Sequence, residues 1–355
     1  MARRKLIWHI GLAEAPRPLV AANLAEHGSV LGEAGVRVAA SADEARLATH
    51  ELLRTHKSAG LSRDEVEGRW ARICDRVWQH KGTWILSTPD LCVADKDQIS
   101  LALNPLIGVE VHLVVTLDSF SQQVYGGWLA ELRAGGTAGW DKYAARVLAP
   151  TRDHRQAERF WAGHDVPAGL SRWGWTLHAD RVHVIASADP AEQWAELLSL
   201  VGVPAAGLEA VVPPYADPAG VAVLRKVNRQ LSDRLGAGTV ALVGSGGQAR
   251  AAMPAVDASS LEPLVAEWTA ALAEAGHDLR GDLSLLLDHS TRTALPDAHD
   301  QLRVAVDALA RALVENARLR ESVAELHAAL EKVDRKRRKL KRRLKRELEH
   351  VTVSG

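Results

Sequence analysis

Short runs of apolar residues alternate with longer segments of helical periodicity along most of the chain. Four runs are rich in apolar and β-branched residues and predict strands at Lys5–Ile10, Thr83–Ser87, Val109–Thr116 and Arg181–Ser187. The third run is nearly continuous in such residues, as expected of a strand that is covered on both faces. Because the segments between the runs are longer than hairpin turns, this order favours a parallel sheet flanked by helices, and therefore an α/β fold.

Three of the longer segments predict helices. Ser62–His80 begins with the pattern Ser-x-x-Glu, a capping box that satisfies free backbone amides at the start of a helix. Asp217–Leu235 is the second helical segment. The third, Ser259–Ala275, has apolar residues three and four positions apart and stops before Gly276, a residue typical of the position that follows a helix.

From Leu302 onward the apolar residues follow a seven-residue repeat. Its a positions hold Leu302, Leu309, Asn316, Val323, Leu330, Arg337, Leu344 and Val351, and its d positions hold Ala305, Ala312, Leu319, Leu326, Val333 and Leu340. A repeat of this length predicts a coiled coil, and an asparagine at an a position fixes register and favours a dimer. The alternative is one long helix that folds back on the α/β part of the chain. Arg337 at an a position predicts that tight pairing ends near that residue.

These patterns predict three parts of the chain. We expect an α/β domain over residues 1–290, a linker over 291–300, and a coiled-coil helix with a basic end over 301–351. We expect the helix to form a homodimer through residues 302–351.

The charge of the chain is balanced overall but unevenly distributed. The 355 residues hold 44 Lys and Arg against 44 Asp and Glu. Residues 331–350 alone hold 11 Lys or Arg and 4 Asp or Glu, so the rest of the chain is acidic. This basic end is interpreted either as a solvated helix face or as a weak, non-specific binding site for nucleic acid or an anionic membrane surface.

The remaining composition favours a protein of the cytoplasm. Cys74 and Cys92 are too few for a disulfide framework and lack the spacing of a zinc site, so we expect no metal. No run approaches the roughly 18 apolar residues of a transmembrane helix. Ala2–Lys5 followed by Leu6–Leu12 imitates a signal peptide, but the apolar stretch is short and contains a histidine, so we interpret it as a strand.

Two segments carry glycines that could contact a phosphate. In "HIGLAEAPRPLV", which begins at His9, the first strand breaks at Gly11 and leads into a helical segment. Gly244–Gly247 also invites this interpretation, but it lacks the following Lys-Ser/Thr and a helix start, which favours a surface loop.

The order of these segments resembles actinobacterial members of the sulfotransferase family. The family's first strand reads like His-Ile-Gly-Leu-Pro-Lys-Thr-Gly-Thr-Thr and opens a helix, and "HIGL" stands at the same place here. Further similar segments are "WILSTPDL" (84–91), "VHLVVTLDSFSQQVYGGWLAEL" (111–132), "DRVHVIAS" (180–187), "VLRKVNRQLSDRL" (223–235) and "AEAGHDLRGDLSLLL" (273–287). The resemblance covers residues 5–290 and implies a P-loop-type parallel sheet.

The resemblance also implies a reaction. Members of the family bind 3′-phosphoadenosine 5′-phosphosulfate and transfer its sulfuryl group to a hydroxyl or amine. Their first turn offers backbone amides, a helix N-terminus and a lysine to the phosphosulfate. An arginine and a serine after the central strand hold the 3′-phosphate.

The first turn departs from the family pattern. Glu14 stands where the lysine is expected, Pro16 replaces the glycine, and Arg17 and Pro18 replace the two threonines. Two prolines remove two amide donors, and the glutamate places a negative charge beside the expected anion. Only Arg17 favours anion binding. Helix capping alone also explains the glutamate and the prolines.

The second site departs in the same direction. Asp118 stands at the arginine position, Ser119 at the aspartate position, Gln122 at a further basic position and Gly126 near the serine position. The sign of the charge at the 3′-phosphate is therefore reversed. Asp118 and Ser119 also suit a simpler role, as caps of a predicted helix over Phe120–Arg133.

These substitutions predict a sulfotransferase-fold protein that is non-catalytic, a binding or scaffolding pseudoenzyme that self-associates through its C-terminal helix. No catalytic residue and no cofactor are then expected, and Gly11, Arg17, Asp118, Ser119 and Gly126 are degenerate donor-site positions. One alternative is an active sulfotransferase that uses 3′-phosphoadenosine 5′-phosphosulfate with Arg17 in place of the missing lysine. A second alternative is a binder of anionic surfaces through residues 331–350.

Overall fold

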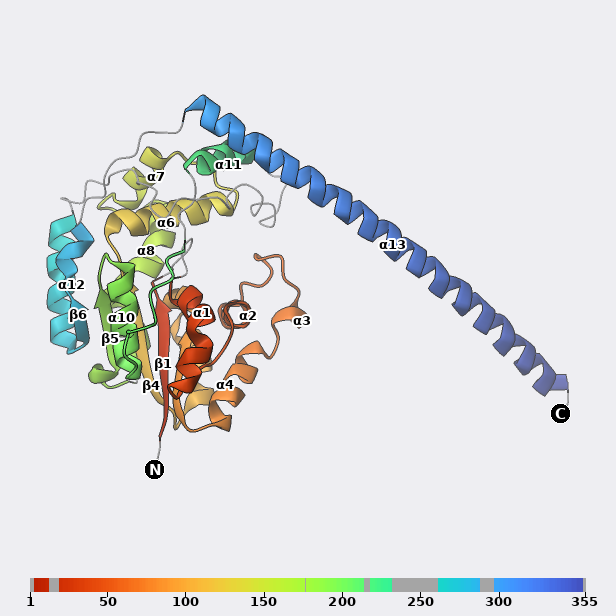
Figure 1. Cartoon of the computed structure of the whole chain (residues 1–355), viewed down its shortest axis with the longest axis horizontal. Helices are drawn as coiled ribbons and strands as arrows, with labels where there is room; N and C mark the ends of the chain where they lie inside the picture. Colours follow the sequence, from red (N-terminus) through yellow and green to blue (C-terminus); the bar gives the residue numbers. More distant parts are fainter. Residues whose placement is uncertain are drawn as a thin grey trace. The chain divides into compact units, whose positions relative to one another are not determined.

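A computed structural model describes residues 3–12, 19–175, 177–213, 218–231, 261–287 and 297–353, with side chains described up to residue 341 (Figure 1). The chain divides into two compact units, residues 1–297 and residues 298–355.

The first unit is built from alternating strands and helices. In chain order its elements are β1 (Arg4–Gly11), α1 (Leu19–Glu33), β2 (Val36–Val38), α2 (Ala42–Leu53), α3 (Arg63–Val66), α4 (Arg69–Gln79), β3 (Gly82–Ser87), the 3₁₀ helix η1 (Pro89–Val93), α5 (Lys96–Leu103), η2 (Asn104–Leu106), β4 (Glu110–Leu117), α6 (Phe120–Arg133), α7 (Trp140–Val147), α8 (Arg155–His164), α9 (Val166–Gly174), η3 (Ala179–Arg181), β5 (Val182–Ala186), α10 (Pro190–Val201), α11 (Pro218–Leu231), α12 (Glu262–Ala275), β6 (Asp278–Gly281) and η6 (Leu283–Leu287). The second unit contains α13 (Ala298–Val353).

In the described residues, six strands form one parallel sheet in the order β2-β3-β1-β4-β5-β6. The four strands predicted from the sequence are confirmed as β1, β3, β4 and β5, and the predicted α/β fold with a parallel sheet is confirmed. The sequence missed β2 and β6, the two edge strands, which have only 3 and 4 residues.

Both faces of the sheet are covered, which explains why its central strands are almost continuously apolar. Leu6, Trp8 and Ile10 of β1 belong to one hydrophobic cluster, together with side chains of α2, α4, α6 and α12. Ile7 of β1 belongs to a second cluster, with side chains of α1 and α10. Figure 1 shows α1 and α10 in front of the strands.

The predicted helix over Ser62–His80 is wrong in one respect, because the structure divides it into α3 and α4. The break falls at Gly68, which has a φ of 73°, a left-handed conformation that glycine adopts without strain. The Glu51 carboxylate accepts hydrogen bonds from the backbone amides of Gly68 and Trp70, both at 2.7 Å, and so satisfies the start of α4. The predicted capping box at Ser62 is confirmed.

The other predicted helices have the following outcomes. Phe120–Arg133 is confirmed as α6 with Ser119 as its N-cap. Within the predicted Asp217–Leu235, α11 covers residues 218–231, and α12 lies inside the predicted Ser259–Ala275 and ends before Gly276. Leu261 is the residue before α12, and residues 217, 232–235, 259–260 and the glycines at 244–247 lie outside the described residues.

The heptad segment is helical throughout, since α13 runs without interruption over 56 residues and contains all the predicted a and d positions. It begins at Ala298, within the segment that the sequence assigned to a linker. Across the described ranges, we find no helix that combines the length and apolar character needed to cross a membrane.

Candidate functional site

The candidate site lies at the carboxyl end of the sheet, between β1 and β4. From β1 the chain continues to β2, which lies toward one edge of the sheet. From β4 it continues to β5, which lies toward the opposite edge. A parallel sheet opens a crevice where its connections diverge in this way, and α/β proteins place ligands there. Gly11 is in register with Val115, and the Leu12 amide donates a hydrogen bond to the Thr116 carbonyl at 3.3 Å. The ends of β1 and β4, which lead into the two segments compared with the family pattern, therefore meet at the carboxyl end of the sheet.

Gly11 is held by close packing against η1. A Cβ atom on this glycine would lie 2.9 Å from the Cβ of Cys92, closer than side chains approach one another. The described structure therefore gives Gly11 a packing role. Glu14, Pro16, Arg17 and Pro18, the next residues of the predicted turn, lie outside the described residues.

Asp118 and Ser119 cap the amino end of α6, as the sequence predicted. The Ser119 hydroxyl accepts a hydrogen bond from the Gln122 amide at 3.3 Å, and the Asp118 carboxylate accepts one from the Ser119 amide at 2.8 Å. These amides would be the donors for an anion at this helix start. The chain's own side chains occupy them. Gly126 lies buried further along α6.

Gln123 is a polar residue of this site that the sequence did not single out. Its side chain is buried, and its amide nitrogen donates to the Asp118 carbonyl at 2.6 Å. Its amide oxygen is buried without a hydrogen-bond partner. Since the Asp118 carbonyl requires a donor, the amide is correctly oriented and the unsatisfied atom is an acceptor. Beside the Asp118 carboxylate, this oxygen makes the start of α6 rich in acceptors.

A buried polar row lies within the sheet below this edge. The His9 ring contacts the Ser87 hydroxyl through Nδ1 at 2.9 Å and the Thr116 hydroxyl through Nε2 at 3.1 Å. These contacts join the ends of β3, β1 and β4. His9 is fully buried, and burial lowers its pKa to about 3, so the ring is neutral at neutral pH. A neutral imidazole satisfied on both nitrogens ties the strand ends together and carries no charge to the edge.

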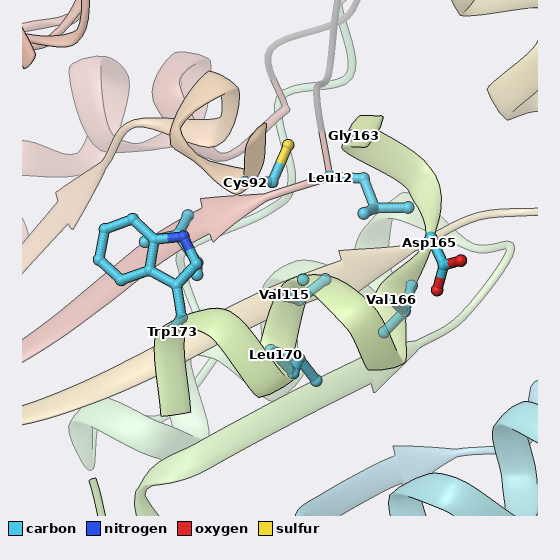
Figure 2. Close-up of a pocket in the computed structure, with 10 residues that line it drawn as sticks. Leu12, Cys92, Val115, Gly163, Asp165, Val166, Leu170 and Trp173 are labelled. Carbon is cyan, nitrogen blue, oxygen red and sulfur yellow. The ribbon is translucent and has the colours of Figure 1, made fainter. Parts of the chain in front are cut away.

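A small hollow lies near the carboxyl ends of β1 and β4, on the side lined by Ile10, Leu12 and Val115 (Figure 2). Its empty space is about 260 Å³, part of it open to solvent. Its lining consists of Ile10, Leu12, Cys92, Val115, Gly163, Asp165, Val166, Gly169, Leu170 and Trp173. The one charged group in this lining is Asp165, whose carboxylate already caps α9 and pairs with Arg152 at 3.4 Å. The hollow is therefore an apolar space without a free charge to orient a polar ligand.

A second polar cluster lies at the opposite, amino-terminal end of the strands. His112 contacts Glu110 at 3.1 Å and His183 at 2.9 Å, and His183 contacts Asp278 at 2.7 Å. Arg280 continues the chain of contacts to Asp278 at 2.8 Å. Burial lowers the pKa of both histidines. This cluster fastens β4, β5 and β6 together and is not part of the candidate site.

Among the described residues, the start of α6 offers hydrogen-bond acceptors and the hollow offers apolar contact. Within the part of the chain that the structure describes, no group of three His, Cys, Asp or Glu side chains is placed to hold a metal ion. Comparison with protein-family models, curated proteins and solved structures found no match for the chain.

Proposed function

We propose that the first unit is a sulfotransferase-like fold that has lost the binding of its sulfuryl donor and serves as a binding or scaffolding domain. The resemblance over residues 5–290 is supported by the topology, because β1 is central and its carboxyl end adjoins that of β4. The two segments that the family uses for one donor molecule are neighbours here. This neighbourhood of the strand ends supports the resemblance, while the residues that follow them differ from the family pattern.

The observation that carries the proposal is the capped start of α6. A 3′-phosphate needs donors and positive charge, whereas the groups at this helix start include the Asp118 carboxylate and the buried, unsatisfied oxygen of Gln123, which are both acceptors. Two amides at this helix start, those of Ser119 and Gln122, are already bonded to the side chains of Asp118 and Ser119. A second negative charge would be repelled in a half-buried environment, so the residues present do not fit the donor.

Calorimetric titration of the full chain with 3′-phosphoadenosine 5′-phosphate tests this proposal. We expect no binding by the natural protein. A Glu14→Lys/Asp118→Arg variant restores the two cations of the family pattern, and we expect it to bind. Glu33→Lys/Asp141→Arg is the matched control, because it changes the net charge equally at two exposed residues, and it should not bind.

Two results would count against the proposal. Micromolar binding by the natural protein that disappears in Arg17→Ala would show that the donor site is intact, and would favour an active sulfotransferase. Failure of the restored variant to bind, with an unchanged fold, would remove the support for the family resemblance.

We propose further that the protein self-associates through α13. Its a and d positions expose large apolar side chains to solvent along one seam. An exposed apolar surface of this kind indicates a site of association with another protein surface. Sedimentation velocity of the full chain should give a dimer, and Leu326→Glu should give a monomer. Glu325→Gln changes the adjacent residue outside the seam and should leave the dimer intact. A monomeric natural protein at micromolar concentration would refute self-association.

A further inference from the structure

The exposed apolar seam of α13 has a defined central part. We call Leu309, Ala312, Asn316, Leu319, Val323, Leu326, Leu330 and Val333 the central seam. Its six large apolar side chains are each 50–68% exposed, although they lie at the heptad spacing of a coiled-coil core. The seam spans more than three heptads, the length over which such a repeat indicates a coiled coil.

We infer that two copies of this chain pair through the central seam as a parallel, in-register coiled coil. This inference rests on the proposed self-association and specifies its geometry. Asn316 faces the same asparagine of the partner copy, and the two basic ends of the helices lie side by side.

Asn316 provides the first argument for this geometry. In a parallel pair in register, its amide meets an identical amide, so that each side chain gains a hydrogen-bond partner within the core. In an antiparallel pair with Leu302 opposite Leu340 of the other helix, Asn316 instead faces Leu326. Both amides of the dimer would then be buried against leucine without a partner, which disfavours that arrangement.

The charges beside the seam provide the second argument. Glu315 occupies a g position and Arg320 the e position five residues later. In a parallel pair, each g residue lies next to the e residue of the following heptad on the partner helix, so Glu315 and Arg320 form two interhelical ion pairs. In an antiparallel pair, g positions lie next to g positions. The other g residues of the central seam are Ser322 and Ala329, which carry no positive charge to form an ion pair with a carboxylate.

The packing residues favour two strands over three. Around Asn316, the a position holds the β-branched Val323 and the d positions hold Leu319 and Leu326. A β-branched residue at a with leucine at d favours a parallel dimer. Pairing ends after Val333, because the next a residue is an arginine that would face its own copy.

Cysteine cross-linking in the full chain distinguishes the arrangements. Leu309→Cys and Val333→Cys are made as separate single variants and oxidised alone and as a mixture. In the parallel dimer, each variant forms a disulfide with itself. In the mixture, positions 309 and 333 lie about 36 Å apart along the helix and do not cross-link. In the antiparallel dimer, the single variants do not cross-link and the mixture does.

Two controls make the result specific. The natural cysteines, Cys74 and Cys92, are both buried, so the natural protein sets the background of the assay. Lys332→Cys places a thiol next to the seam but outside it, and we expect little cross-linking.

The assay has three outcomes, which distinguish a wrong helix orientation from the absence of self-association. Cross-linking of each variant with itself supports the parallel dimer. Cross-linking only in the mixture overturns the parallel geometry and leaves self-association standing. A protein that sediments as a monomer, with no cross-linking in either case, refutes self-association itself.

Charge reversal tests the register independently. Glu315→Arg and Arg320→Glu should each weaken the dimer about tenfold, because each turns two attractive contacts into two repulsive ones. The double variant should restore the natural dissociation constant within about threefold. Glu321→Arg, on the outer face of the helix, is the matched control and should leave the dissociation constant of the dimer unchanged. The proposed register would be overturned if the free energy of dimerisation lost in the double variant equalled the sum of the losses in the two single variants.

Discussion

The buried His9 ring predicts a specific loss of stability in mild acid. It is fully enclosed in the sheet, and burial lowers its pKa from 6.5 to about 3. At pH 5 the folded protein therefore keeps this ring neutral, whereas the unfolded chain takes up a proton. Because the unfolded state binds more protons across this range, the free energy of unfolding falls as the pH falls.

The size of the effect follows from the shift. Each pH unit between the two pKa values costs about 1.4 kcal/mol, so His9 alone removes about 2.7 kcal/mol between pH 7.5 and pH 4.5 and about 4 kcal/mol by pH 3. His164 is also buried with a pKa lowered to about 4, and it adds a similar loss above pH 4. Glu44 has a pKa of about 2 because it is bonded to Arg76, and its contribution is lost mainly below pH 4.5. The window from pH 7.5 to 4.5 therefore reports chiefly on histidines.

Urea unfolding at pH 7.5 and pH 4.5, followed by tryptophan fluorescence, measures this loss. All 11 tryptophans precede residue 298, so the signal reports the first unit alone. In His9→Gln, which cannot take up the proton, the difference in unfolding free energy between the two pH values should shrink by about 2.7 kcal/mol. His178→Gln is the matched control, because the His178 side chain is 87% exposed. An equal pH difference in His9→Gln and the natural protein would refute a neutral, buried His9.

Further substitutions test the packing and capping of the first unit by the same urea assay at pH 7.5. Gly281→Ala should destabilise by more than about 2 kcal/mol, because φ is +94° there and the new Cβ would lie 1.9 Å from the Ala186 carbonyl oxygen. Ser41→Ala should cost about 1 kcal/mol, since it removes the capping box that Ser41 forms with Glu44. Phe120→Ala should cost about 3–5 kcal/mol, because this fully buried ring packs against two tryptophans beside the candidate site. A loss below about 1 kcal/mol for the phenylalanine would contradict the packing described.

The parts of the fold that sequence reasoning predicted are those that local pattern determines. The central strands are apolar because both faces are covered, and this leaves a signal in the sequence itself. The cap of α6 was predictable for a similar reason, since Ser119 and the helix it caps are adjacent in the chain. α13 carries its period over seven heptads, a strong signal for a helix.

The parts that sequence reasoning missed depend on residues far apart in the chain. The division between α3 and α4 is stabilised by Glu51, which lies 17 residues before the glycine whose amide it binds. The edge strands are too short to show a period of two, and only their pairing with β3 and β5 makes them strands. The side-chain oxygen of Gln123 is buried without a hydrogen-bond partner. The sequence could not predict this, because it depends on all the residues packed around the side chain.

The sequence suggested a candidate site through the family resemblance and left its chemistry open. The resemblance implied that the segments of Gly11 and Asp118 serve two ends of one ligand, and the sheet brings together the strand ends that carry these residues. Family resemblance could indicate which charges differ but not what the amides of α6 bind instead. That required the hydrogen bonds of Asp118 and Ser119.

The short outer strands of the sheet influence how the protein behaves at high concentration. An exposed edge strand is a template on which another chain can add by backbone hydrogen bonding, and long apolar edges lead to aggregation. Here β2 and β6 offer only 3 and 4 residues, and β6 carries Asp278 and Arg280 in a network of ion pairs with Glu196. A strand from another molecule would find few free amides and would have to displace charged side chains. The sheet is thereby protected against fibril growth from its edges, and association is directed to other surfaces.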